Sequence, residues 1–127
     1  MADVAVVILN FNGASYLRQF LPSVIEHSPD ADIIVADNAS TDDSVSFLKE
    51  NFPDIRLIIL NENLGYAGGY NAALTEVNHE FSILLNSDIE VTPGWIDPVI
   101  DYMSAHHHVV ACQPKILDFN DKERFEY

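Results

Sequence analysis

The chain is poor in cysteine and in basic residues. Its 127 residues include one cysteine, and six Lys or Arg stand against 20 Asp or Glu, which gives a formal net charge of −14 at pH 7. The single cysteine, Cys112, excludes an internal disulfide, and its apolar neighbours predict a small buried hydrophobe. The shortage of positive charge excludes general nucleic-acid binding, because such binding needs a basic face that releases counterions.

Long hydrophobic runs are also missing. No apolar segment approaches the roughly 20 residues that cross a bilayer, so we expect no membrane span. The start, Met1-Ala2-Asp3, lacks the basic region of a signal peptide. Hydrophobic residues still make up 48% of the chain, which suits one globular domain over residues 1–127. Together these features favour a cytoplasmic protein.

Short apolar runs alternate with stretches whose apolar residues have helical spacing. This alternation predicts an α/β fold with a mostly parallel sheet and helices on both of its faces. We expect strands at residues 4–9, 33–36, 57–60, 81–85 and 109–112. Helices are expected around residues 17–25, after Ser40 or Thr41 with Asp42 and Asp43 in the first turn, from about Gly69 to Val77, and from Pro93 onward.

Small polar residues collect where the first four predicted strands end. The clusters are Asn10-Phe11-Asn12-Gly13, Asp37-Asn38-Ala39-Ser40, Asn61-Glu62-Asn63-Leu64-Gly65 and Asn86-Ser87-Asp88. In a right-handed parallel sheet these ends share one edge, which is where open α/β sheets bind ligands. The same residue types also suit ordinary turns, but four clusters on one edge favour a ligand crevice.

Two carboxylates in these clusters are candidates for ligand contact. Asp88, at the end of a buried strand, would offer Mg²⁺ or Mn²⁺ a hard oxygen, or it would only satisfy backbone N–H groups in a turn. Asp37, followed by Asn38, would bind a base edge or a ribose hydroxyl, or it would cap the next helix, a role that Ser40 also fits. None of the six basic residues lies in a cluster, so a bound diphosphate would need a divalent cation to neutralise it.

Other residues give weaker signals. Gly65, Gly68 and Gly69 would let backbone approach a ligand at a helix start, although their spacing is not the dinucleotide fingerprint. Tyr66, Tyr70 and Trp95 could stack on a base, with core packing favoured for Trp95. The run His106-His107-His108 is interpreted as a solvated helix end, because adjacent histidines do not converge on one metal ion.

The clusters together resemble family 2 glycosyltransferases, which have a GT-A, Rossmann-like fold, and in particular bacterial rhamnosyltransferases. The matching segments are residues 6–12 (VVILNFN), 35–42 (VADNASTD), 61–71 (NENLGYAGGYN) and 84–91 (LLNSDIEV). They follow the order and spacing of the family over roughly residues 4–115. The resemblance implies transfer of a sugar from a nucleotide-diphosphate donor, UDP- or dTDP-linked, with inversion and a divalent metal.

The resemblance also implies a role for particular positions. The nucleoside would be contacted by the loop at residues 9–12, which includes Leu9, Asn10 and Asn12, and by Asp37 with Asn38. The sugar-nucleotide pocket would be shaped by Asn63, Gly65, Gly68 and Asn71. Asn86-Ser87-Asp88 would stand for the Asp-x-Asp-like motif, with Asp88 as the Mn²⁺ or Mg²⁺ ligand.

Family members continue into a second half that builds the acceptor site and supplies the catalytic base. We therefore expect this chain to be the N-terminal, donor-binding portion of a longer transferase, with its base unknown and with little or no turnover. The acceptor would be a glycan or lipid-linked sugar of cell-wall or polysaccharide synthesis, and the full-length protein could lie against the inner face of the membrane. Self-association through exposed apolar surface is a further expectation.

Two other classes of function remain as alternatives. A magnesium-binding receiver module of signalling proteins has a similar length and a lysine after its fifth strand, where Lys115 would fit, but Asn10 and Asn12 stand where it needs acids. A non-catalytic binding domain, which would meet a partner through its outer helices, is the other.

Overall fold

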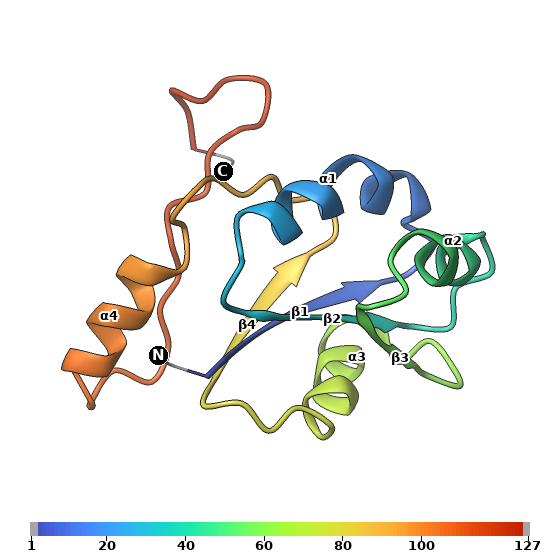
Figure 1. Ribbon diagram of the computed structural model, residues 1–127, viewed down its shortest axis with the longest axis horizontal. Helices are drawn as coiled ribbons and strands as arrows, with labels where there is room; N and C mark the ends of the chain where they lie inside the picture. The colour runs from blue at the N-terminus through green and yellow to red at the C-terminus, as the bar shows by residue number, and fades with distance from the viewer. Residues whose placement is uncertain (1–2, 126–127) are drawn as a thin grey trace.

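The computed structural model describes residues 3–125, in which strands and helices alternate along the chain (Figure 1). The elements are β1 (Val4–Asn10), α1 (Ala14–Glu26), β2 (Asp32–Asp37), α2 (Ser44–Asn51), β3 (Arg56–Ile59), α3 (Gly65–Leu74), β4 (Phe81–Asn86) and α4 (Asp97–Ala105). The predicted α/β class and the first four predicted strands are confirmed.

The four strands form one parallel sheet in the order β3-β2-β1-β4. β1 lies between two neighbours, and its residues from Val4 to Ile8 are at most 6% exposed because both faces of the sheet are covered there. At the ends of the strands, Asn10 pairs with Asp37 and Leu9 pairs with Asn86. The carboxyl ends of the strands therefore lie at one edge, as predicted.

Helices cover both faces of this sheet. In Figure 1, α1 and α2 lie on one face and α3 lies on the other. Side chains alternate along β1, so Val6 packs in the cluster that contains Leu17 of α1, whereas Val7 packs in the cluster that contains Ala73 of α3. The helical stripe expected at residues 17–25 is confirmed, since Leu17, Phe20, Leu21 and Val24 are all buried in α1.

The predicted fifth strand is wrong. Among the described residues, the segment 109–112 pairs with no strand, and Val110 is 90% exposed. β4 is therefore a lateral edge strand, with β1 as its one neighbour in the sheet. The prediction that Cys112 is buried is also wrong, because its side chain is exposed. Apolar residues favour a strand, but a strand forms only where a neighbouring backbone pairs with it.

Three predicted helix starts shift. α2 begins at Ser44, so Asp42 and Asp43 precede the helix, and α3 begins at Gly65, before the predicted Gly69. α4 begins at Asp97, with a proline in its first turn. Trp95 lies just before α4, packs against the main core cluster as favoured, and donates a hydrogen bond from Nε1 to Ser28 Oγ at 3.1 Å.

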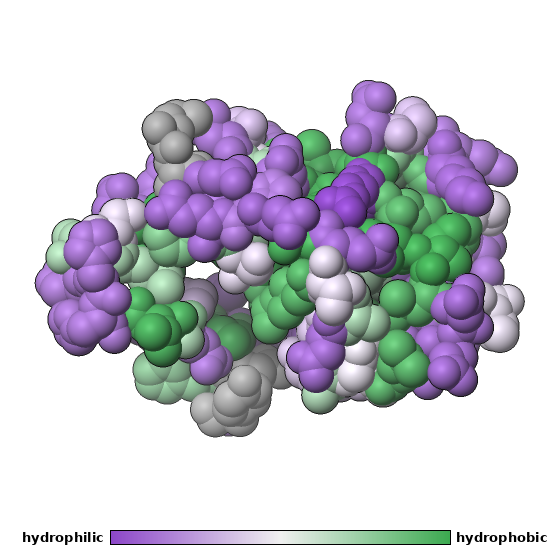
Figure 2. All heavy atoms as spheres, turned by 90° about the horizontal axis from the view of Figure 1, so that it is seen from below, coloured by the Kyte–Doolittle hydropathy of each residue, from purple (hydrophilic) through white to green (hydrophobic). Residues whose placement is uncertain are grey.

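The surface is mixed in polarity. Viewed from the α3 side, hydrophobic side chains gather toward the end of the molecule where α2 and β3 lie, and hydrophilic side chains dominate toward α4 (Figure 2). Over residues 3–125, none of the helices has both the length and the apolar character needed to cross a membrane.

Candidate functional site

A crevice of about 390 Å³ opens at the carboxyl edge of the sheet, where the segments that follow all four strands meet. Its lining contains eight of the twelve predicted site residues, which are Leu9, Asn12, Asn38, Asn63, Gly65, Asn86, Ser87 and Asp88. The other predicted residues, Asn10, Asp37, Gly68 and Asn71, do not belong to this lining. The segments at the four strand ends therefore meet in one crevice, as expected from the sequence. The predicted residues that line this crevice and those that lie outside the lining have different roles.

Asp37 and Asn10 lie beneath the crevice and tie β1 to β2. Asp37 is 1% exposed, and its Oδ1 accepts hydrogen bonds from Asn10 Nδ2 at 3.0 Å and from Ser40 Oγ at 2.7 Å. Its Oδ2 accepts a third hydrogen bond, from the Ser40 backbone N–H at 2.9 Å. A buried carboxylate needs such partners, and these three fix the loop after β2 against the end of β1.

Asn12 carries this bracing to the crevice surface. Its side-chain Oδ1 accepts hydrogen bonds from the backbone N–H groups of Thr41 and Asp42, at 2.7 and 3.1 Å. Its own N–H donates to Ser40 Oγ at 2.9 Å, and its φ of 51° lies in the left-handed region. Asn tolerates that backbone conformation better than most residues do, so the sequence places an asparagine where the loop must turn.

Asp42 stabilises the starts of two helices at the same edge. Its Oδ2 accepts a hydrogen bond from Ala14 N–H, at the start of α1, and its Oδ1 accepts one from Ser44 N–H, at the start of α2. Desolvation by burial acts to raise the pKa of Asp42, but the Ser44 and Ala14 hydrogen bonds and the Arg18 charge outweigh it, so this pKa is lowered. The carboxylate is thus held in its charged form.

Asn38 makes the equivalent link from β2 to the loop before α3. Its Nδ2 donates to Asn63 Oδ1 and to the Gly65 carbonyl, both at 3.0 Å, and its Oδ1 accepts from Leu64 N–H at 2.9 Å. It lines the crevice although only 3% of its surface is exposed. Asn38 therefore sets the position of Asn63 and Gly65, the two predicted pocket residues on the next segment.

The glycines of α3 act on packing. A Cβ on Gly69 would come within 2.8 Å of the Leu9 side chain and 3.0 Å of Asn38 Nδ2, so glycine lets the helix approach the strand ends. The predicted approach of a ligand is possible at Gly65, which lines the crevice. Gly68 and the exposed Asn71 lie on α3 outside the lining.

Space is also kept free at the start of α1. A Cβ on Gly13 would lie 2.6 Å from Asn10 Oδ1 and 3.3 Å from Ser87 Oγ, so only glycine fits between β1 and the tip of β4. Asn10 Oδ1 is buried and has no hydrogen-bond partner in residues 3–125. This oxygen is the one acceptor of the β1–β2 network that is not used.

Asp88 differs from the other acids at this edge because it is an exposed acid that lines the crevice. Within residues 3–125 it forms no side-chain hydrogen bond or ion pair. The described lining contains no Lys or Arg. Asn86 and Ser87 beside it add an amide oxygen and a hydroxyl, so the donor set is hard oxygen, which fits Mg²⁺ or Mn²⁺ with water and phosphate as further ligands.

Aromatic side chains complete the crevice, and the sequence identified them only in part. Phe11, Tyr16 and Tyr66 line it and are about half exposed or more, at 48%, 49% and 64%. Tyr66 was a candidate for stacking on a base. Phe11 lies inside a polar cluster, which was the available signal for it, but nothing in the helical pattern distinguished Tyr16.

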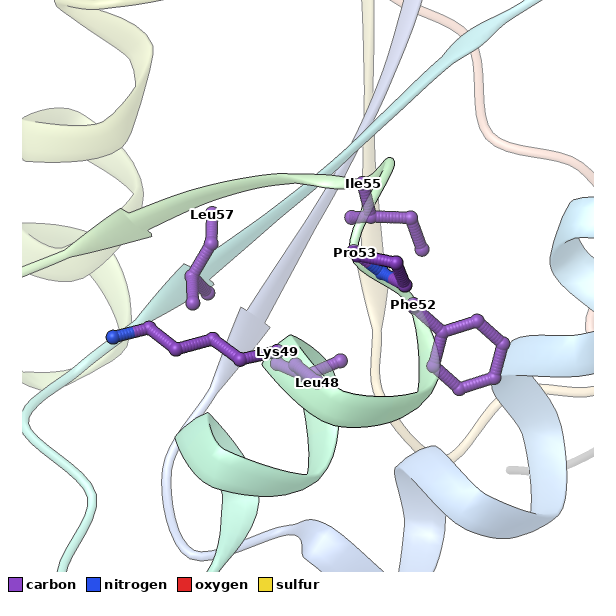
Figure 3. Close-up of a pocket in the computed structure, with 6 residues that line it drawn as sticks. All are labelled: Leu48, Lys49, Phe52, Pro53, Ile55 and Leu57. Atoms are coloured by element: carbon purple, nitrogen blue, oxygen red, sulfur yellow. The ribbon is translucent and has the colours of Figure 1, made fainter.

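A second hollow lies between α2 and β3 and has a different character. Its volume is about 200 Å³, and apart from Lys49 its lining is apolar: Leu48, Phe52, Pro53, Ile55 and Leu57. Figure 3 shows the Lys49 side chain extending along one side of this groove. It holds no predicted site residue.

The opposite edge of the sheet carries a second acidic group. His79 Nε2 lies 2.7 Å from Asp32 Oδ2 and 3.9 Å from Asp3 Oδ1. These three side chains could converge on one ion, but His79 Nδ1 is buried without a partner in residues 3–125. A metal on Nε2 would require Nδ1 to carry a proton, usually donated to a second group, so the arrangement fits a histidine–aspartate pair better than a metal site.

Comparison with known sequences identifies the family of the chain. The family model described as glycosyl transferase family 2 matches residues 5–126. An N-acetylglucosaminyl-diphospho-decaprenol L-rhamnosyltransferase of Mycobacterium tuberculosis is 28% identical over 93% of this chain. An uncharacterized glycosyltransferase of Nostoc is 30% identical over 94% of the chain. The chain spans only 43% and 38% of the length of these two relatives.

Comparison with solved structures shows the same fold. Staphylococcus aureus TarS, residues 1–349, in complex with UDP, superimposes with a TM-score of 0.70 at 21% identity, over 83% of this chain and 33% of TarS. A mannosyltransferase of Pyrobaculum calidifontis, in complex with GDP-Man and Mn²⁺, has a TM-score of 0.68 at 21% identity, over 91% of this chain and 36% of its own. With a family model that matches nearly its whole length and a fold shared with glycosyltransferases, the chain belongs to glycosyl transferase family 2.

Proposed function

We propose that this domain binds the nucleotide-diphosphate sugar of a glycosyltransferase together with Mn²⁺ or Mg²⁺, and that the donor is UDP- or dTDP-linked. The observation that carries the proposal is Asp88, an exposed acid that lines the crevice, has no side-chain hydrogen bond or ion pair within residues 3–125, and has no Lys or Arg beside it in the described lining. A diphosphate in such a crevice is repelled unless a cation neutralises it.

The similar proteins support this choice of ligand. TarS was crystallised with UDP, and the Pyrobaculum mannosyltransferase with GDP-Man and Mn²⁺. In this chain Asp88 would hold the metal ion, with Asn86 and Ser87 beside it. When bound, the ion would stabilise negative charge on the diphosphate leaving group.

The remaining residues divide into contact and support. Leu9, Asn12 and Asn38 would meet the nucleoside, and Asn63 and Gly65 would shape the pocket around the sugar nucleotide. Asn10 and Asp37 would act from below, because their polar atoms bond to each other and to Ser40. Gly68 and Asn71 would contribute through the position of α3.

For the reaction as a whole, we propose inverting transfer to a glycan or lipid-linked sugar on the cytoplasmic side of the membrane. The mycobacterial relative is named as an N-acetylglucosaminyl-diphospho-decaprenol L-rhamnosyltransferase, which supports a lipid-linked class of acceptor. Inversion requires a base that deprotonates the acceptor hydroxyl, and we assign that role to no residue of this chain.

A receiver module is disfavoured, since Lys115 follows no strand in the described sheet.

Isothermal calorimetry of the protein with UDP and with dTDP, in EDTA and in Mn²⁺, tests the proposal. We expect one of the two nucleotides to bind about tenfold more tightly or better in Mn²⁺, a gain of roughly 1.4 kcal/mol. Absence of binding by both nucleotides in Mn²⁺ would refute it. A transfer assay with labelled donor should show little or no turnover by this chain.

A further inference from the structure

The buried side chain of Asn10 leaves one hydrogen-bond acceptor unused. Asn10 is 0% exposed, and its Oδ1 has no partner within residues 3–125. Turning the amide over would not help, because Nδ2 donates to Asp37 Oδ1 at 3.0 Å and to Ser40 Oγ at 3.3 Å. The turned amide would set its oxygen against the Asp37 carboxylate. Since buried acceptors in folded proteins are nearly always paired, we expect a donor to reach Asn10 Oδ1.

The space beside this oxygen is kept open by Gly13. A Cβ on Gly13 would lie 2.6 Å from Asn10 Oδ1 and 3.3 Å from Ser87 Oγ, so both oxygens border the same small space. The φ of Gly13 is −105°, which other residues also adopt. Glycine is therefore required here by the closeness of Asn10, and the backbone conformation alone does not require it.

Ser87 provides the hydroxyl that borders this space. It follows β4 directly, precedes Asp88 and lines the crevice. Its hydroxyl forms no hydrogen bond within residues 3–125. A serine hydroxyl has one proton to donate and two lone pairs, and rotation about χ1 moves its oxygen without moving the strand. Ser87 can therefore donate its proton toward Asn10 Oδ1 and keep its lone pairs for a ligand.

We propose that Asn10 is a positioning residue of the metal site, because its unused Oδ1 accepts a hydrogen bond from the Ser87 hydroxyl when metal ion and nucleotide are bound. This bond joins the turn that carries Asp88 to the β1–β2 network, since Asn10 Nδ2 already donates to the buried Asp37 carboxylate. Partners behind the ligands of a metal commonly fix their orientation. The inference rests on the proposed function and extends it to Asn10 and Gly13, which would touch no ligand.

The test is a double-mutant cycle of Gly13→Ala and Ser87→Ala, measured by calorimetry with UDP and with dTDP in EDTA and in Mn²⁺. The methyl group of Gly13→Ala fills the space between the two oxygens, and Ser87→Ala removes the donor. We expect each variant to lower the affinity gain from Mn²⁺ by about threefold, as for one hydrogen bond, and to bind alike in EDTA. Because both changes break the same bond, the double variant should lose no more than either single one.

Ser82→Ala is the matched control for Ser87→Ala. Ser82 is an exposed serine near the other end of β4, so its loss should leave the gain from Mn²⁺ at the wild-type value. A crystal structure of the wild-type protein with Mn²⁺ and nucleotide checks the bond without any variant. In that structure Ser87 Oγ should lie about 3 Å from Asn10 Oδ1, and a separation beyond roughly 3.5 Å would overturn the inference.

The calorimetry has outcomes of both kinds. An unchanged gain from Mn²⁺ in Gly13→Ala, or losses that multiply to about ninefold in the double variant, would overturn the inference and leave the proposed function standing. Equal weakening in EDTA and in Mn²⁺ would overturn it as well, because it would show a general structural role. Failure of the wild-type protein to bind nucleotide would remove the proposed function and this inference together.

Discussion

The two edges of the sheet both carry acidic residues but use them differently. At the carboxyl edge, Asp37 and Asp42 are enclosed in hydrogen bonds from neighbouring loops, and Asp88 is left facing the crevice. At the amino edge, Asp3 and Asp32 are 63% and 75% exposed and lie beside His79. The number of carboxylates is therefore a poor indicator of a site. What matters is which of them the surrounding groups leave without a partner.

The largest difference between the two edges should appear in the free energy of unfolding. Asp37→Ala removes the acceptor of three hydrogen bonds. The buried Asn10 Nδ2 then keeps only its bond to Ser40 Oγ, and the hydroxyl and N–H of the partly buried Ser40 lose their acceptor, so we expect a loss of about 2–4 kcal/mol in the free energy of unfolding. Asp32→Ala, at the amino edge, should cost less than about 1 kcal/mol because its carboxylate is exposed. Urea unfolding measures both, and similar losses would mean that the Asp37 network is not a brace.

Nucleotide binding should also depend more on the carboxyl edge of the sheet than on the amino edge. Asp88→Ala should abolish the Mn²⁺-dependent part of UDP or dTDP binding, a loss of about 10- to 100-fold in affinity, and leave binding in EDTA unchanged. Asp32→Ala serves as the control, since it removes a carboxylate from the far edge. Calorimetry in both conditions decides the matter, and a Mn²⁺ effect that survives in Asp88→Ala but not in Asp32→Ala would move the metal site to the amino edge.

The dependence of stability on pH should reveal Asp42. Because hydrogen bonds hold its pKa below the ordinary value of 3.8, the stability that Asp42 contributes is present above that value and is lost as the pH falls through the lowered pKa. Asp42→Ala should cost about 1–2 kcal/mol at pH 7, as for loss of a helix cap. Urea unfolding of both proteins from pH 7 down to about pH 3 should show this gap narrowing, and a constant gap would contradict the assignment.

The smallest effect concerns backbone strain at the carboxyl edge. The non-glycine residues with positive φ in residues 3–125 are Asn12 and Ala39, both in loops of this edge. Ala39, with φ of 63°, carries a strain of about 1–2 kcal/mol, so Ala39→Gly should raise the free energy of unfolding by up to about 1 kcal/mol after the entropy of glycine is subtracted. Ala72→Gly, inside α3, should lower it by about 0.5–1 kcal/mol. Thermal unfolding of the Ala39→Gly and Ala72→Gly variants beside the wild type measures the two changes in stability.

Much of the fold and the general location of the site were predictable, because periodicity and strand order are local properties. Solid apolar runs identified the four strands, and polar clusters after each of them identified the edge where they meet. Burial was predicted less well, because β3 and β4 have a neighbour on one side only and are partly exposed, with Ile59 at 51% and Leu84 at 49%. The fifth strand failed because the run around Val110 has strand-like composition but no partner within the described residues. Cys112 failed for the same reason, since burial depends on what packs over a segment.

The different roles of Asp37 and Asp88 could not be predicted, although each lies at or just beyond the end of an apolar strand. β2 has a neighbour on both sides, so its end is enclosed by the loops after β1 and β3, and Asp37 faces Asn10 in register. β4 has a neighbour on one side, so the turn after it is open to the crevice. The position of a strand in the sheet, which the local sequence does not specify, therefore decides whether the aspartate at its end braces neighbouring loops or remains available to a ligand.

By itself, then, the amino-acid sequence determined an α/β chain that resembles glycosyl transferase family 2 and has its polar residues at the strand ends. The reason is that the apolar pattern of a strand and the polar residues of a turn are both local properties of the sequence. Tertiary structure alone decided which polar atoms meet each other and which residues line the crevice, and it brought the buried Tyr70 hydroxyl of α3 to the Leu85 carbonyl near the end of β4. These contacts join residues far apart in the chain, and their geometry depends on how strands are ordered and how closely a helix can approach them.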